Sequence, residues 1–176
     1  MENQGDVLKE AKTNSQKDKY AQCSEPCGDR RMTVAHYYYA CSYPLAPGSV
    51  ILKGNWGRIC RLEAERPIET IFERIRIQEF PDLPSRFNCN FLCPNLQSLI
   101  SFVRTSNRPF DVLYEVVPVD PGARRLETDW TLVRSSLDTA EMEQAARRYW
   151  NPQNVRENEK EILIESDIRI VNQVTP

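Results

Sequence analysis

The segment DVLYEVVPV, residues 111–119, constrains the fold of this chain more than any other stretch. It is mostly apolar and rich in β-branched and aromatic residues, a composition typical of a strand that is covered on both faces. We therefore expect it to be a central strand, with other strands on both of its edges.

Further strands are predicted wherever aromatic and β-branched residues gather between turn residues, at 32–43, 50–52, 87–93, 160–165 and 168–174. GNWGR, residues 54–58, is predicted to be part of a loop because glycine interrupts it twice. Ser166-Asp167 is predicted to join the last two strands as a tight hairpin.

Helices are predicted where apolar residues recur at helical spacing. The first covers 66–80 and has Pro67 in its first turn. The second follows Asn95, which can cap it, and the third follows Asp138, which can form a capping box with Glu141. Strands outnumber helices and do not alternate strictly with them, so we expect an α+β fold with helices packed on mixed or antiparallel sheets.

Length and charge narrow the function classes. A chain of 176 residues suits one domain, which we expect at 32–176, after a flexible polar arm at 1–31. The net charge of -2 does not favour nucleic acid or an anionic membrane as a partner. Neither a membrane-spanning stretch nor a secretion signal is visible. We therefore expect a soluble protein that is cytoplasmic or delivered into a target cell by a dedicated secretion system.

The six cysteines form two C-x3-C pairs, Cys23/Cys27 and Cys89/Cys93, together with Cys41 and Cys60. Such pairs raise the question of a zinc site. The second pair falls in a predicted strand, and the only histidine, His36, is distant in sequence from both pairs. We therefore expect no metal and mostly buried free thiols.

Several standard catalytic sites are excluded by motif. The six glycines form neither the G-x-G-x-x-G turn of dinucleotide-binding folds nor a P-loop. A single histidine excludes a histidine-rich metal site. A Cys–His–Asp or Ser–His–Asp site stays open only through His36, and no G-x-S-x-G turn supports it.

Carboxylate chemistry remains, at NEKEILIES, residues 158–166. On a strand, Glu159 and Glu161 project from the same face, about 6.5 Å apart. A carboxylate held rigidly in this way can stabilise positive charge that develops on a sugar ring. Spacing alone is more typical of a solvated strand edge.

The order of motifs resembles that of ADP-ribosyltransferases, over about residues 33–174. EKEILI is similar to the E-x-E motif of the arginine-directed branch, and an aromatic strand with a histidine, VAHYYY, opens the domain. The sequences GNWGR and PSR resemble those of an uncharacterised bacterial branch of the superfamily. The resemblance implies an ADP-ribosyltransferase-like fold of split mixed or antiparallel sheets with flanking helices. It also implies a transferase that uses NAD as its substrate, with a toxin, an effector and a phage-encoded modifier among the roles it leaves open.

The resemblance also implies site residues. Glu161 would stabilise the oxocarbenium-like transition state, and Glu159 would orient the acceptor. Contacts to NAD would come from His36, Tyr38, Asn90 and Phe91, and Arg86 or Arg58 would meet its pyrophosphate. A substrate-facing loop would carry Tyr149 and Trp150. The acceptor would be a protein side chain, with arginine favoured by the E-x-E motif and nucleic acid not excluded.

Departures from the family pattern keep alternatives open. The arginine-directed branch has an arginine on its first strand and a serine-threonine-serine motif on a middle strand, and this chain has neither. One alternative is a catalytically inactive binding module on the same fold, and another is an NAD glycohydrolase. Individual residues have simpler interpretations too: Arg86 could pair with Asp82, and Trp150 could be a core residue at the end of its helix.

Overall fold

The computed structural model describes residues 35–62, 66–109 and 111–175, which all belong to one compact unit. The predicted arm at 1–31 lies outside the described residues. Along the chain, the elements are β1 (Tyr37–Cys41), β2 (Val50–Ile51), α1 (Asn55–Leu62), α2 (Pro67–Glu79), η1 (Arg86–Asn88), β3 (Asn90–Leu92), α3 (Leu96–Thr105), β4 (Val112–Pro118), β5 (Arg125–Asp129), η2 (Trp130–Leu132), α4 (Thr139–Trp150), η3 (Glu157–Glu159), β6 (Lys160–Ile164) and β7 (Ile168–Val174), where η marks a 3₁₀ turn.

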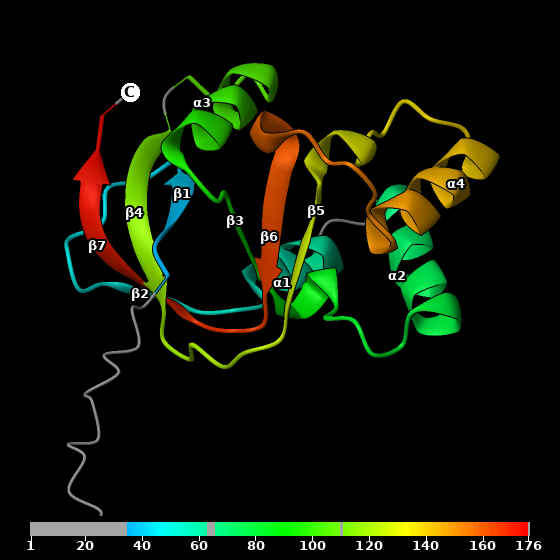
Figure 1. Cartoon of the computed structure of the whole chain (residues 1–176), viewed down its shortest axis with the longest axis horizontal. Helices are drawn as coiled ribbons and strands as arrows, with labels where there is room; N and C mark the ends of the chain where they lie inside the picture. The colour runs from blue at the N-terminus through cyan, green and yellow to red at the C-terminus, as the bar shows by residue number, and fades with distance from the viewer. Residues whose placement is uncertain (1–34, 63–65, 110, 176) are drawn as a thin grey trace, which may run out of the picture. The chain divides into compact units, whose positions relative to one another are not determined.

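The strands form two antiparallel sheets, which lie side by side in Figure 1. The first has the order β1-β4-β7-β2 and the second has the order β3-β6-β5. The predicted α+β class is confirmed, and within the described residues every strand pairing is antiparallel. β4 pairs with both β1 and β7, so the prediction that 111–119 is an inner strand is also confirmed.

The two sheets meet at a single bridge between Tyr38 of β1 and Cys93, which follows β3. Each of these residues donates its backbone N–H to the carbonyl of the other, at 2.9 and 2.8 Å. No further backbone hydrogen bond joins β1 to β3 in the part of the chain that the structure describes. The two strands therefore part beyond the bridge and leave a split between the sheets.

The predicted hairpin at Ser166-Asp167 is wrong. β6 lies between β3 and β5 in the second sheet, whereas β7 pairs with β4 and β2 in the first. A strand has two edges, and both edges of β6 are occupied, so β7 cannot pair with it. Ser166 carries the chain from one sheet to the other, and its carbonyl accepts a hydrogen bond from Asn90 at 2.9 Å.

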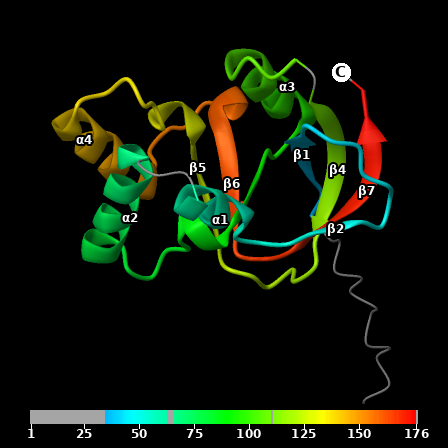
Figure 2. The same ribbon diagram turned by 180° about the vertical axis from the view of Figure 1, so that it is seen from behind.

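The three predicted helices are confirmed. Pro67 begins α2, Asn95 caps α3 by accepting a hydrogen bond from the Ser98 N–H at 2.9 Å, and Asp138 and Glu141 form the capping box of α4. α2 and α4 lie against each other at one end of the second sheet in both views (Figures 1 and 2). Their apolar faces form a core with Leu163 of β6.

The GNWGR segment is not a loop, because Asn55 begins the short helix α1. Gly57 lies against η1, where a Cβ atom at this position would come within 2.3 Å of the Phe87 carbonyl oxygen. Glycine at this position permits close helix packing rather than a turn. Pattern analysis predicted a loop because two glycines lie close together in the sequence.

Two strand predictions also need correction. The strand predicted at 87–93 is shorter because η1 occupies its first residues, and only Asn90–Leu92 pairs with β6. β5 was not predicted because its sequence, RLETD, is largely polar. It is an edge strand in which Thr128 alone is buried, so it needs no apolar pattern. None of the described helices is long and apolar enough to cross a membrane.

Candidate functional site

A cavity of about 660 Å³ lies at the split between the two sheets. Most of its walls come from five regions: β1, α1, β3, α3 and the segment at η2. Arg86 of η1 and Glu161 of β6 also line it. Aromatic side chains contribute to each of these five walls, namely Tyr39, Trp56, Phe91, Phe102 and Trp130. A cavity of this size, with mainly apolar walls and a few polar groups, is typical of a site for a small ligand.

Glu161 is the only carboxylate residue among the described residues that line the cavity. It lies on β6, the middle strand of the second sheet, and its side chain is 10% exposed. Both edges of β6 are paired, which holds the backbone of Glu161 in place. The sequence therefore placed a carboxylate on a rigid element, as expected, and the fold places it at a cavity.

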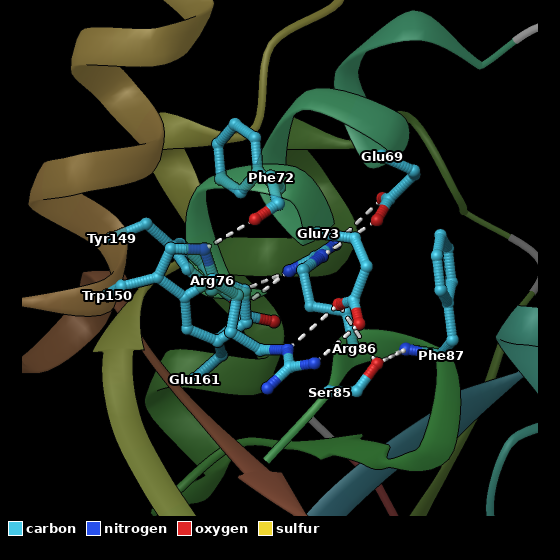
Figure 3. A network of polar contacts seen from close by, with 10 residues as sticks. All are labelled: Glu69, Phe72, Glu73, Arg76, Ser85, Arg86, Phe87, Tyr149, Trp150 and Glu161. Carbon is cyan, nitrogen blue, oxygen red and sulfur yellow. Dashed lines mark hydrogen bonds and ion pairs between the residues drawn. The ribbon is translucent and has the colours of Figure 1, made fainter. Parts of the chain in front are cut away.

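Arg86 lies at the centre of a network of polar contacts with Glu69, Tyr149 and Glu161 (Figure 3). Its guanidinium forms a two-bond fork with Glu69 of α2, at 2.9 Å from Nε and 3.0 Å from Nη2. Its remaining terminal nitrogen, Nη1, donates to the Tyr149 hydroxyl and lies 3.5 Å from Glu161 Oε1. Arg86 lines the cavity, yet its side chain is only 7% exposed and all three of its nitrogens are bonded within the protein. The structure does not pair it with Asp82.

Tyr149 links the arginine to the carboxylate. Its hydroxyl accepts from Arg86 and donates to Glu161 Oε1 at 2.8 Å. The tyrosine is fully buried at the end of α4, where its ring contacts Phe72 edge-on. All hydrogen bonds of Glu161 within the described residues go to Oε1, which leaves Oε2 without a protein donor.

The buried group carries one more negative charge than positive charge when both carboxylates are ionised. Arg86 supplies one cation, and Glu69 and Glu161 supply two anions. Burial raises the pKa of Glu161 above its ordinary value, while Arg86 and the hydrogen bond from Tyr149 act in the opposite direction. When Glu161 is ionised, its negative charge is therefore not fully compensated, and the cavity favours a positively charged group beside it.

Two other predicted contacts, Asn90 and Phe91, also line the cavity. The Phe91 ring stacks near the Arg86 guanidinium, with 4.7 Å between the ring centre and Cζ. Asn90 is buried, and its amide group donates to the Ser166 carbonyl, so it ties the second sheet to the crossover.

Three predicted contacts lie outside the cavity lining. His36 is exposed and its ring nitrogen is 2.8 Å from Glu115. Tyr38 is partly buried at the bridge to Cys93 and packs beside α3. Arg58 is exposed on α1 and donates to the Lys53 carbonyl and to Asn55.

Two details of the sequence prediction are wrong. Glu159 is not on the strand with Glu161, because it ends the 3₁₀ turn η3, where it bonds with Arg156 at 3.1 Å and does not line the cavity. Tyr149 and Trp150 do not lie in a substrate-facing loop, because α4 continues through both. Trp150 is a core residue whose indole donates to the Phe72 carbonyl at 2.8 Å.

Sequence analysis missed two cations of the cavity, Arg108 and Arg134. Arg108 follows α3 and pairs with Asp111, whereas Arg134 follows η2 and donates from Nε to the Thr131 carbonyl. Neither lies in a recognisable motif, and their segments are distant in sequence but in contact through Phe102 and Trp130. No sequence signal distinguishes them from the other arginines of the chain.

Four cysteines are described, and none is in a disulfide. Cys41, Cys89 and Cys93 line the cavity, and burial raises the pKa of both Cys89 and Cys93 to about 12. These thiols are therefore protonated and weakly nucleophilic at neutral pH. The described residues contain no group of three or more histidine, cysteine, aspartate or glutamate side chains that could hold a metal ion, and Cys23 and Cys27 lie outside them.

Comparison with known proteins places the chain in a family. Residues 58–176 match the family model described as protein of unknown function, DUF2441. The match covers more than half of the chain and includes Arg86, Tyr149 and Glu161, whereas β1 and β2 precede it. No curated protein matches the chain. This protein, with its carboxylate at a split between two sheets, therefore belongs to the DUF2441 family.

Proposed function

We propose that this protein is an NAD-dependent mono-ADP-ribosyltransferase in which Glu161 is the catalytic carboxylate. The observation that carries the proposal is the state of this side chain: it is buried, fixed through one oxygen, and lines a cavity of about 660 Å³ with its other oxygen unbonded. The antiparallel sheets, parted beyond a single bridge, also support the split-sheet fold that the motif order resembles.

The chemistry follows from the charge of the site. In the reaction, the bond between the ribose C1′ and the nicotinamide nitrogen breaks, and its electron pair leaves with nicotinamide. Positive charge then develops on the ribose, where an ionised carboxylate in a poorly solvated site stabilises it. The acceptor nucleophile forms the new bond to C1′ and releases a proton. In the ground state the positive charge lies on the nicotinamide ring, and the excess negative charge of the group around Arg86 favours its movement to the ribose in the transition state.

The shape of the cavity supports a ligand with flat rings. Aromatic walls from Trp56, Phe91 and Trp130 suit nicotinamide or adenine. Beyond the bridge, the edges of β1 and β3 at Ala40 and Phe91 make no backbone hydrogen bonds to each other. Such edges offer N–H and carbonyl groups to a polar ligand.

Arginine is the acceptor that the surroundings of Glu159 support best. In the structure this carboxylate already binds a guanidinium, that of Arg156, whose side chain is 77% exposed. The guanidinium of an acceptor arginine can replace that of Arg156 at this carboxylate, because the two groups are identical. Glu159→Gln is then expected to impair transfer to arginine more than hydrolysis of NAD.

A catalytically inactive binding module is the second candidate function. The observation that favours it is the location of the cations: His36 and Arg58 lie outside the cavity, and Arg86 is fully bonded inside the protein. A glycohydrolase, which would transfer ADP-ribose to water, is an outcome of the same test.

The test uses Glu161→Gln, which keeps the shape and the oxygen that accepts from Tyr149 but removes the charge. Wild-type protein is incubated with labelled NAD and lysate, and nicotinamide release and labelled protein adducts are both measured. The proposal expects a loss of at least a thousandfold in the variant, in line with the loss of a charge-stabilising group. Glu165→Gln is the matched control, because Glu165 is close in sequence but lies outside the cavity lining.

The outcomes separate the candidates. Release of nicotinamide without adduct would indicate a glycohydrolase. Binding of NAD without turnover would indicate the inactive module. Full activity of Glu161→Gln would overturn the mechanism.

A further inference from the structure

One part of the cavity wall combines aromatic rings with cations. It consists of Phe102 and Arg108 from the α3 side together with Trp130 and Arg134 from the η2 side, and we call it the aromatic rim. Phe102 and Trp130 meet edge-on with 5.5 Å between ring centres, and Arg108 lies 5.8 Å from the centre of the Phe102 ring. Figure 1 shows α3 and the end of β5, where η2 begins, near the same end of β6. The two arginines therefore flank a continuous pair of rings.

The three arginines of the cavity differ in how much of their charge is already neutralised. Arg86 pairs with Glu69, and Arg108 lies 2.6 Å from Asp111 Oδ2. Arg134 donates Nε to the Thr131 carbonyl at 2.7 Å, and its two terminal nitrogens make no hydrogen bond or ion pair with the described residues. Arg134 is exposed.

Within the cavity lining, the unneutralised charges are therefore one cation at the aromatic rim, Arg134, and one anion, Glu161. A complementary ligand has an anionic part next to a flat ring at the rim, and a part that becomes cationic at Glu161. Phosphate oxygens fit a guanidinium because it presents two donors in one plane. Base rings fit the aromatic side chains because every base has a π-face.

We infer that the aromatic rim binds a nucleoside diphosphate group, with Arg134 as its main phosphate ligand and Arg108 as a second one. The inference deepens the proposed function, since it identifies which part of the cavity recognises the phosphates of the dinucleotide. It replaces Arg58 and Arg86, the two residues that sequence analysis had selected for the pyrophosphate.

The experiment measures binding of ADP to the full chain by calorimetry at low ionic strength, with adenosine as the ligand that lacks phosphate. Arg134→Gln is expected to weaken ADP binding at least tenfold, and Arg134→Lys, which keeps the charge but loses the fork, is expected to weaken it less. Adenosine is expected to bind more weakly than ADP and to be insensitive to both variants. The affinity for ADP is also expected to fall as salt is added.

Arg148→Gln is the matched control, because it removes the same charge from an exposed position on α4 that is not part of the cavity lining. It is expected to bind ADP like the wild type. Circular dichroism and thermal unfolding check that each variant is folded, and Arg108→Gln tests the second ligand.

Any of these results would overturn the inference: no binding of ADP by the wild type, equal binding by Arg134→Gln, or binding of adenosine as tight as that of ADP. A short single-stranded oligonucleotide that binds more tightly than ADP would also overturn it, in favour of a nucleic-acid site.

Failure of the proposed function is distinct from these outcomes. If ADP binding depends on Arg134 but NAD is not turned over, the rim inference stands and the transferase does not. If Arg134→Gln turns over NAD as fast as the wild type does, the transferase stands and the rim inference does not.

Discussion

Arg86 lies between two regions that use a buried glutamate differently. On the helical side, Glu69 of α2 meets the guanidinium with both oxygens, at 2.9 and 3.0 Å, and is covered by the core between α2 and α4. On the cavity side, Glu161 of β6 meets it with one oxygen at 3.5 Å. Both side chains are at most 10% exposed, so burial does not distinguish them.

The number of satisfied oxygens does distinguish them. A carboxylate whose two oxygens are both paired offers nothing to a ligand and serves to compensate the buried arginine. A carboxylate held by one oxygen at the wall of a cavity keeps the other for chemistry. The comparison therefore supports a structural role for Glu69 and the functional role that we propose for Glu161.

The largest expected effect is the difference in stability between variants of the two glutamates. Glu69→Gln is expected to lower the free energy of unfolding by about 3–5 kcal/mol, because it leaves the buried arginine without its main counter-charge. Glu161→Gln is expected to change it by less than about 1 kcal/mol, because the amide oxygen still accepts from Tyr149 and the desolvated charge is removed. Urea unfolding of both variants measures the difference. Equal losses would mean that both glutamates are structural.

A smaller effect is expected from Tyr149→Phe, which removes the hydroxyl between the two regions. We expect a loss of about 1–3 kcal/mol in stability, because Arg86 and Glu161 both lose a partner. The variant should also have a higher Glu161 pKa, because the hydroxyl stabilises the ionised form. Tyr114→Phe is the matched control: this buried hydroxyl accepts from the Leu45 N–H in the other sheet. It should lower stability without moving the pH profile of activity.

The dependence of stability on pH sharpens the comparison further. Burial raises the pKa of Glu161 in the folded state, so the folded protein binds more protons than the unfolded chain just above the ordinary value of 4.5. The contribution of Glu161 to stability therefore falls as the pH rises from 4.5 through the folded pKa, and is constant above it. Wild type should lose stability relative to Glu161→Gln across this window. The opposite slope would mean that the ion pair with Arg86 outweighs burial.

The smallest effect is expected at Arg58, which sequence analysis proposed as a pyrophosphate contact. Its bonds to Lys53 and Asn55 place it on the surface of α1, outside the cavity lining. We expect Arg58→Gln to change kcat/KM for NAD by less than about twofold, a change within the range of surface substitutions. Steady-state kinetics beside Arg134→Gln provides the measurement. A loss as large as that of Arg134→Gln would return the phosphate site to α1.

Local patterns made part of the fold predictable. The caps at Asn95 and Asp138 and the apolar stripes behind them determine where α3 and α4 begin, because these interactions span only a few residues. The central position of 111–119 followed from its apolar composition for a similar reason. Glu161 could also be selected as a candidate, because the sequence pattern shows a glutamate directly before the buried residues of a strand.

The remaining features depend on contacts between distant segments. Pattern analysis paired β6 with β7 because they are neighbours in sequence, whereas the fold gives both edges of β6 to β3 and β5. It read GNWGR as a loop because the closeness of Gly57 to Phe87 exists only after folding. It placed Glu159 on the strand face of Glu161 although the predicted strand began at residue 160, whereas Glu159 ends the 3₁₀ turn η3 and bonds with Arg156.

By itself, the sequence determined the α+β class, the main helices and strands, and a glutamate on a rigid strand as the place to look for chemistry. Only the tertiary structure decided that this glutamate shares Arg86 with Glu69, that it lines a cavity at the split between the sheets, and that Arg108 and Arg134 lie on the same wall. The physical reason is the distance along the sequence over which each interaction acts. Caps and periodicity act within a few residues, whereas a buried charge is defined by the partners that folding brings to it from elsewhere in the chain.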